Sequence, residues 1–201
     1  MVANILYTND YINVTRDELL SNLQKELKPK RFKHVLRVEE TALNLAERYG
    51  YTNLQKVSIA ALMHDHCKDY EKDKMYQPAS MYAPYEPLKF ANEAIWHGLA
   101  AAELARAKYN VLDDEIVNAI AEHTIGEKKM SLLSKILFVA DYIEPGRDFP
   151  GVDKARELAD KAIDKVVFYK MRETVMHLVE TNKKVYVESV VIYNHWTKKQ
   201  E

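Results

Sequence analysis

The chain has 201 residues and a formal net charge of −1, because 29 Lys and Arg side chains are balanced by 30 Asp and Glu side chains. This balance excludes a broad basic surface for duplex nucleic acid, and the single cysteine, Cys67, excludes a disulfide framework and a cysteine-rich zinc module. Apolar runs such as residues 59–63 are far shorter than the ~18 residues that span a bilayer. Asn9 and Asp10 lie where a signal peptide would keep its apolar core. We therefore expect a cytoplasmic protein with no membrane partner.

Turn-forming residues are scarce, since the chain contains only 5 Gly and 6 Pro. This scarcity favours an all-α fold of long helices over short strands. Residues 1–14 carry no helical signal and are predicted to form an irregular leader, followed by a single domain over residues 15–201. Thr15 and Glu18 have the spacing of a capping box, which predicts the start of a short helix.

The remaining helices are predicted from apolar spacing and from their end signals. Pro29 suits the first position of a helix that Gly50 ends. Residues 70–87 contain three prolines and are predicted to form a long loop that could act as a lid. Val185–Val187 could form a short strand but has no evident partner. Further helices are predicted over residues 54–64, 91–108, 113–122, 131–142, 154–182 and 188–199.

Several of these helices carry a histidine or an aspartate at the edge of an apolar face. Each such histidine on its own would more often be a core or rim side chain, and each aspartate a solvated helix-end group. Together they form an ordered set, and facing helices of a bundle can direct such side chains to one centre. Imidazole and carboxylate groups suit Fe, Mn or Zn, and this set could serve two ions, or one ion with extra groups over a substrate. Its members are His34, His64, Asp65, His97, His123 and Asp141.

The order H…HD…H…H…D resembles the HD superfamily of metal-dependent phosphohydrolases. The flanking motifs are more specific: HDHCKD at 64–69, HT-x-G-x-x-x-MS at 123–131 and ADYIEPGRDFPGV at 140–152. They resemble the YqeK family of bacterial HD-domain enzymes, which cleave diadenosine tetraphosphate symmetrically. The resemblance implies an HD-domain helical bundle with a metal centre between helices, a metal-ligand core over about residues 30–148, and C-terminal helices over residues 154–199.

The resemblance also implies a role for individual residues. The primary metal ligands would be His34, His64, Asp65 and Asp141. His97 and His123 would hold a second ion or contact phosphate. Substrate contacts would come from Arg31, Lys68, Arg147 and Thr124, although each of the three cations could also be a solvated surface charge. Asp69 is expected to orient Lys68 or face solvent, Cys67 to be small and partly buried, and His66 to lie on the surface.

The expected chemistry is attack of a metal-activated hydroxide, with Asp65 bridging two ions if both are present, on an inner phosphorus of the tetraphosphate, which yields two ADP. The resemblance favours iron as the cofactor, while Mn and Zn stay open. One alternative is another HD phosphohydrolase that acts on nucleoside monophosphates, deoxynucleotides or guanosine alarmones. Another is a non-catalytic nucleotide sensor whose metal only staples the bundle. The sequence leaves the oligomeric state open, with a homodimer among the alternatives.

Overall fold

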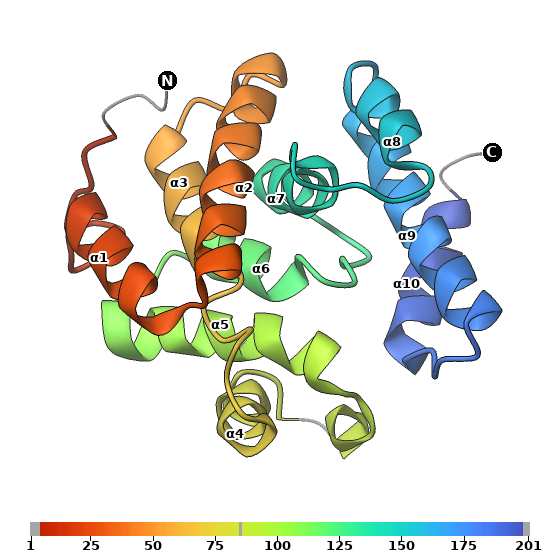
Figure 1. Cartoon of the computed structure of the whole chain (residues 1–201), viewed down its shortest axis with the longest axis horizontal. Helices are drawn as coiled ribbons and strands as arrows, with labels where there is room; N and C mark the ends of the chain where they lie inside the picture. Colours follow the sequence, from red (N-terminus) through yellow and green to blue (C-terminus); the bar gives the residue numbers. More distant parts are fainter. Residues whose placement is uncertain (1–4, 85, 199–201) are drawn as a thin grey trace.

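The structure is a computed structural model that describes residues 5–84 and 86–198 (Figure 1). The described part is all helical and contains no strand, as the sequence predicts. Its α-helices, in chain order, are α1 (Arg16–Glu26), α2 (Pro29–Arg48), α3 (Leu54–Met63), α4 (Lys72–Tyr82), α5 (Glu93–Tyr109), α6 (Asp114–Glu122), α7 (Leu132–Ile143), α8 (Val152–Ala159), α9 (Ile163–Glu180) and α10 (Val187–Thr197). A short 3-10 helix, η1 (Glu86–Phe90), precedes α5.

Most other helices of the bundle pack around α7 or around its neighbours. Helix α2 packs against α3 and α7, α6 packs against α5 and α7, and α9 packs against α7, α8 and α10. Figure 1 shows α8, α9 and α10 on the side of α7 away from α1 and α3. Among the described residues, no helix is long and apolar enough to cross a membrane.

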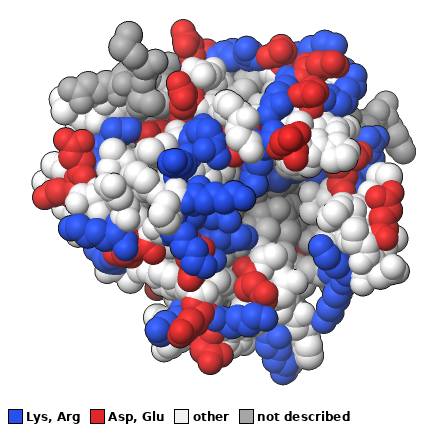
Figure 2. Space-filling model, viewed as in Figure 1, with Lys and Arg blue, Asp and Glu red and all other residues white. Residues whose placement is uncertain are grey.

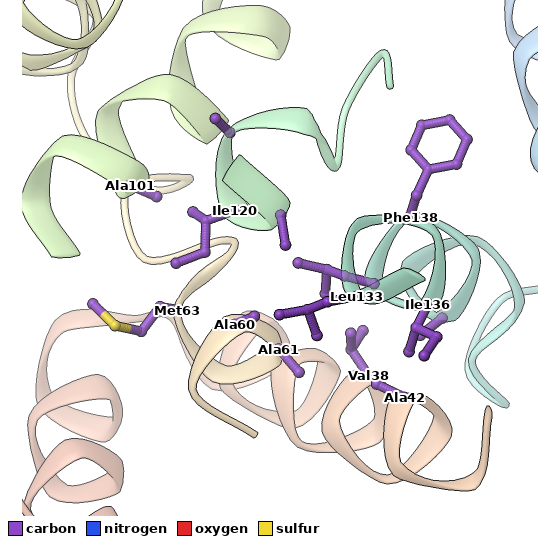
Figure 3. Close-up of a cluster of buried hydrophobic side chains, with 14 of the residues drawn as sticks. Val38, Ala42, Ala60, Ala61, Met63, Ala101, Ile120, Leu133, Ile136 and Phe138 are labelled. Atoms are coloured by element: carbon purple, nitrogen blue, oxygen red, sulfur yellow. The ribbon is translucent and has the colours of Figure 1, made fainter. Parts of the chain in front are cut away.

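The core lies where α2, α3, α6 and α7 meet. Helix α3 is buried over its whole last two turns because every residue from Val57 to Met63 is apolar or small. Figure 3 shows the side chains that fill this junction, which include Val38, Ala60, Ala61, Ile120 and Leu133. Small alanines let these helices approach closely, so the residues at their ends are brought near one another.

Local signals set several helix boundaries as predicted. The Thr15 side chain accepts from the Glu18 N–H, and the Glu18 side chain accepts from the Thr15 N–H, which completes a capping box. Pro29 occupies the first turn of α2, where its missing N–H costs least. Gly50 follows α2 with a φ of 71°, a left-handed conformation that glycine adopts without strain.

The predicted loop over residues 70–87 is wrong over most of its length, because Lys72–Tyr82 forms α4 with Pro78 inside it. Pro78 cannot donate to the carbonyl of Lys74, a defect that costs ~3 kcal/mol in an isolated helix. Packing against α5 offsets this cost, since Met75 and Ala79 lie one turn apart and are both buried.

Two C-terminal predictions also fail. The single helix predicted over residues 154–182 is divided into α8 and α9. Contacts with the end of α2 stabilise the break, because Arg48 pairs with Asp160 and the Tyr49 hydroxyl donates to the Ala159 carbonyl at 2.6 Å. The suggested strand at Val185–Val187 does not form, since α10 begins at its last residue.

The described part of the leader, residues 5–14, packs on the bundle without forming a helix. Ile12 is 1% exposed and joins the core. The Asn13 N–H donates to the Tyr109 carbonyl at 3.0 Å, and the Tyr7 hydroxyl lies 2.6 Å from Ser58 Oγ. The division of the chain at residue 15 stays a prediction, while these contacts show that Ile12 belongs to the packed core and that Tyr7 and Asn13 are bonded to the bundle.

Candidate metal centre

Five helices bring the predicted ligand side chains to one buried point. His34 lies in the second turn of α2, His97 in the second turn of α5 and Asp141 near the end of α7. His64 and His123 are the residues that directly follow α3 and α6. The four histidines are each no more than 4% exposed, and Asp65 is 3% exposed.

Asp65 lies between two groups of histidines. Its Oδ2 is 3.5 Å from His34 Nε2 and 3.4 Å from His64 Nε2. Its Oδ1 is 3.1 Å from His97 Nε2 and 3.8 Å from His123 Nε2. A carboxylate that faces both groups in this way has the geometry of a bridge between two ions.

Asp141 completes the first group. Its Oδ1 is 3.2 Å from His34 Nε2 and 3.9 Å from His64 Nε2. One ligand atom each from His34, His64 and Asp141 lies within 4.8 Å of the others, and the same holds for His64, Asp65 and His123. Each of these two triads, which share His64, is therefore compact enough to enclose an ion.

Hydrogen bonds behind the centre orient three imidazoles. Nδ1 of His64 lies 2.7 Å from the Ala61 carbonyl, and Nδ1 of His123 lies 2.7 Å from the Ile120 carbonyl. Each carbonyl belongs to the last turn of the helix that the histidine follows. Because Nδ1–H donates backwards, the Nε2 lone pair is directed into the centre, as a metal ligand requires. His34 is held in the same way, with Nδ1 3.1 Å from a carboxylate oxygen of Glu144.

Electrostatics favour the metal-binding protonation states of Asp65 and His123, but not that of His64. Burial, together with the neighbouring His97 and His64, lowers the pKa of His123 well below its usual range. Burial opposes ionisation of Asp65, but His64 and His97 hold its pKa well below the ordinary value. Burial favours neutral His64, yet Asp65 raises its pKa, so a proton competes with a metal for His64.

One buried atom supports the fit of an ion directly. His64 Nε2 is buried and has no hydrogen-bond partner among the described residues. Such an atom is costly when unpaired, and an ion among these nitrogen and oxygen donors would satisfy it. The donor set therefore fits a divalent transition metal.

Cationic side chains surround the carboxylates. Arg31 Nη1 donates to Asp65 Oδ2 at 2.5 Å, and Arg147 pairs with Asp141 Oδ1 while its Nε donates to the Asp141 carbonyl at 2.8 Å. Lys68 Nζ lies 3.2 Å from His97 Nδ1, and burial lowers the pKa of this lysine.

A cavity of about 420 Å³ opens beside the centre, lined by Arg31, His34 and Arg147 together with Lys28, Lys30 and Arg37. Figure 2 shows Lys and Arg side chains gathered beside a hollow on this face. Thr124 Oγ1 is 3.4 Å from His123 Nε2. The structure thus brings every residue of the predicted site to the centre or its rim.

Comparisons with known proteins agree with this geometry. The HD domain family model matches residues 31–146. This chain belongs to the HD-domain family. It is 35% identical over 181 residues to a Bacillus subtilis protein, a match that covers 90% of this chain and 97% of the relative. It is 37% identical over 187 residues to a Staphylococcus aureus protein, covering 92% and 96% of the two chains. Both relatives are named "Bis(5'-nucleosyl)-tetraphosphatase, symmetrical".

A solved structure matches the HD-domain fold over most of the chain. The protein is described as a predicted HD superfamily hydrolase involved in NAD metabolism from Clostridium acetobutylicum. It superposes with a TM-score of 0.84 at 33% identity and covers 91% of this chain and 97% of its own. The predicted resemblance to the YqeK group of HD-domain proteins is confirmed by these relatives.

Two residues of this HD-domain centre were missed by the sequence interpretation. Glu144 is 1% exposed and accepts hydrogen bonds from His34, Arg37 and the Gly146 N–H. Its signal lay within the EPG stretch of the third motif. Lys170 of α9 is 5% exposed and lies 3.3 Å from Asp141 Oδ2. No local motif marks it, because a single lysine in an amphipathic helix usually faces solvent.

Three predictions near the HD motif need correction. His66 is fully buried, not on the surface, because the turn after α3 presses it against α1, where its Nε2 lies 2.7 Å from Glu26 Oε2. Cys67 is fully rather than partly buried, and burial raises the pKa of its thiol to about 12. Asp69 does not orient Lys68, since it accepts from the Lys28 N–H at 3.1 Å.

Proposed function

We propose that this HD-domain protein hydrolyses diadenosine tetraphosphate symmetrically to two molecules of ADP. The observation that carries the proposal is the convergence of the HD ligand set with three cations, of which Arg31 and Arg147 line a cavity and Lys68 lies beside His97. The names of the Bacillus and Staphylococcus relatives support the substrate class. In this reaction one water adds to an inner phosphorus, and the oxygen that bridged the two inner phosphorus atoms leaves with the second ADP.

We assign the primary ion to His34, His64, Asp65 and Asp141. His97 and His123, with Asp65 as a bridge, would hold a second ion or contact phosphate. A bound divalent ion supplies Lewis acidity and lowers the pKa of water to about 7. Iron is our first choice because this mixed imidazole and carboxylate set suits it, and Mn and Zn are the alternatives.

The cations of the rim would bind and orient the tetraphosphate. A guanidinium has five N–H donors. Arg31 uses one N–H donor in its hydrogen bond to Asp65, and Arg147 has N–H donors that are not bonded to Asp141. Both side chains line the cavity. Arginine suits a bidentate grip on phosphate, whereas Lys68 would act as a point charge. These cations would stabilise the charge that develops on the phosphoryl oxygens.

Two further cavities suit the nucleoside halves of a symmetrical substrate. One of about 290 Å³ is lined by Phe90, Ile95, Thr124 and Tyr186, and Thr124 is adjacent to His123. The other, of about 460 Å³, has the rings of Tyr142 and Phe149 in its wall, with centroids 4.9 Å apart. Thr174 of α9 lines both cavities. Aromatic and apolar walls of this kind bind the faces of purine bases.

Product analysis tests the proposal. The protein is stripped of metal, Fe²⁺ is restored anaerobically with Mn²⁺ in parallel, and the products of diadenosine tetraphosphate are separated by chromatography. We expect a single ADP peak that is lost in Asp65→Ala and kept in Asp153→Ala, a control at an aspartate whose side chain is 88% exposed on α8. ATP with AMP would overturn the attack at an inner phosphorus. Tight nucleotide binding without turnover would favour the sensor.

We also propose that the enzyme acts in the cytoplasm, where free nucleotides are found. Cell fractionation followed by the same chromatographic assay tests this location.

A further inference from the structure

We propose that Lys170 is a positioning residue that holds Asp141 as a one-oxygen metal ligand and ties the turn of His123 to the same point. The inference rests on the metal centre of the proposed function and not on the identity of the substrate. Lys170 reaches the centre from α9, which lies outside the residues matched by the HD family model. A C-terminal helix thus completes a centre whose ligands all lie within the residues that the family model matches.

The lysine ammonium has three N–H donors, and each has a separate acceptor. Lys170 Nζ donates to the Phe138 carbonyl at 2.7 Å, to the His123 carbonyl at 3.1 Å and to Asp141 Oδ2 at 3.3 Å. No donor is left for a phosphate, and the side chain is only 6% exposed. Lys170 therefore acts through other residues and does not touch the substrate.

The two carboxylate oxygens of Asp141 are thereby divided between two tasks. Oδ2 is bound by the buried Lys170, whereas Oδ1, which also accepts from Arg147 at the rim of the cavity, lies 3.2 Å from His34 Nε2 and faces the first ligand group. Rotation of the carboxylate to offer both oxygens to an ion would break the contact with the ammonium. Lys170 thus favours coordination through Oδ1 alone.

The cost of burying this ammonium indicates a specific role. The Lys170 side chain is only 6% exposed, so its charge is almost completely removed from water. The Phe138 ring lies 3.8 Å from Nζ and gives a partial cation–π compensation. An apolar side chain would fill the same space between α7 and α9 without the free-energy cost of removing a charge from water. The presence of a charged side chain at this position is explained by its contacts with the Asp141 carboxylate and with the His123 carbonyl.

Metal affinity tests the inference in the absence of any substrate. Mn²⁺ binding to the chelator-treated protein is measured by calorimetry for wild type, Lys170→Met and Lys135→Met. Lys135 is a matched control, because it also joins α7 to α9, through Asp164 at 2.7 Å, but it does not touch the centre. We expect Lys170→Met to bind Mn²⁺ about 10- to 100-fold more weakly, which is typical for loss of a group that orients a ligand. Lys135→Met should bind as wild type does.

The outcomes separate positioning from packing. A dissociation constant for Lys170→Met within twofold of wild type, with only a lower Tm, would overturn the inference. If Lys170→Met does not fold, Lys170→Gln keeps a donor for the carbonyls and removes the charge, and unchanged Mn²⁺ affinity in that variant would be equally decisive against it. Weakened Mn²⁺ binding in a protein that leaves diadenosine tetraphosphate intact would support the role of Lys170 and contradict only the proposed activity.

Discussion

The carboxylate of Glu144 makes the free energy of unfolding of the metal-free protein depend on pH in the acidic range. The substitution Glu144→Gln measures this dependence separately from that of the other groups. Burial opposes its ionised form, but hydrogen bonds from Arg37, the Gly146 N–H and His34 lower the pKa of Glu144 to about 2, from an ordinary value of 4.5. In the unfolded chain the carboxyl binds a proton at higher pH than in the folded protein. Its stabilising contribution is therefore complete above about pH 4.5 and is lost as the pH falls from there toward about 2.

The size of this contribution follows from the difference between the two pKa values. Each pH unit corresponds to about 1.4 kcal/mol, which gives an upper limit of about 3 kcal/mol. The Arg37 side chain is 35% exposed, so solvent screens part of the interaction and we expect about 2 kcal/mol. In Glu144→Gln, an amide N–H₂ would face donors, and the variant should lose this stability at pH 7.

Urea unfolding of both proteins, followed by circular dichroism in the presence of a chelator, measures the effect. The difference in the free energy of unfolding should be about 2 kcal/mol at pH 7 and should narrow by about 1 kcal/mol between pH 4.5 and 3.5. Glu47→Gln, on the exposed face of α2, controls for removal of a charge. A constant difference between wild type and Glu144→Gln from pH 7 to 3.5 would refute the assigned pKa and the hydrogen bonds that cause it.

Substitutions at three other positions examine the site and the leader. Gly98→Ala should weaken metal binding by the second ligand group, His97 and His123, because the new Cβ would lie 3.0 Å from His123 Cε1. A metal stoichiometry equal to that of wild type would show that the His123 ring moves aside without cost and would contradict this prediction. Arg147→Ala should lower kcat/KM about 100-fold in steady-state assays, and Arg147→Lys should lower it less because lysine keeps the positive charge. Equal losses of kcat/KM in the two variants would contradict a bidentate contact between Arg147 and phosphate. Ile12→Ala should reduce the free energy of unfolding by about 2–4 kcal/mol, since Ile12 is 1% exposed; a change below about 0.5 kcal/mol in urea titrations would mean that the leader is peripheral.

The parts of the fold that depend on local chemistry were predictable. Thr15, Pro29 and Gly50 act on their own backbone or on that of residues three or four positions away, and each marks a helix end as expected. Pro78 shows the opposite case. Its local effect argues against a helix, but the burial of Met75 against α5 outweighs it, and the identity of that partner is not written in the local sequence.

The residues of the candidate centre also divide into those whose role the local sequence indicates and those whose role depends on long-range packing. His64 follows an apolar helix and His123 follows an amphipathic helix with a buried face, and the sequence indicates their role through the ordered set to which both belong. His66 lies two residues further on, after the helix has ended, and the turn decides that it meets Glu26 of α1. Lys170 reaches Asp141 only because α9 crosses α7, a long-range contact that no spacing within α9 reveals.

The charge of the whole chain also conceals the feature that suits a polyanionic substrate. A formal net charge of −1 describes an even balance, yet cations outnumber carboxylates at the centre. The carboxylates there are Asp65, Asp141 and Glu144, and the cations beside them are Arg31, Arg37, Lys68, Arg147 and Lys170. Because each carboxylate has a basic partner in the metal-free state, adding a divalent ion makes the cavity still more positive. A local excess of positive charge at a buried centre would therefore favour binding of the proposed tetraphosphate substrate, although the total charge of the protein does not suggest it.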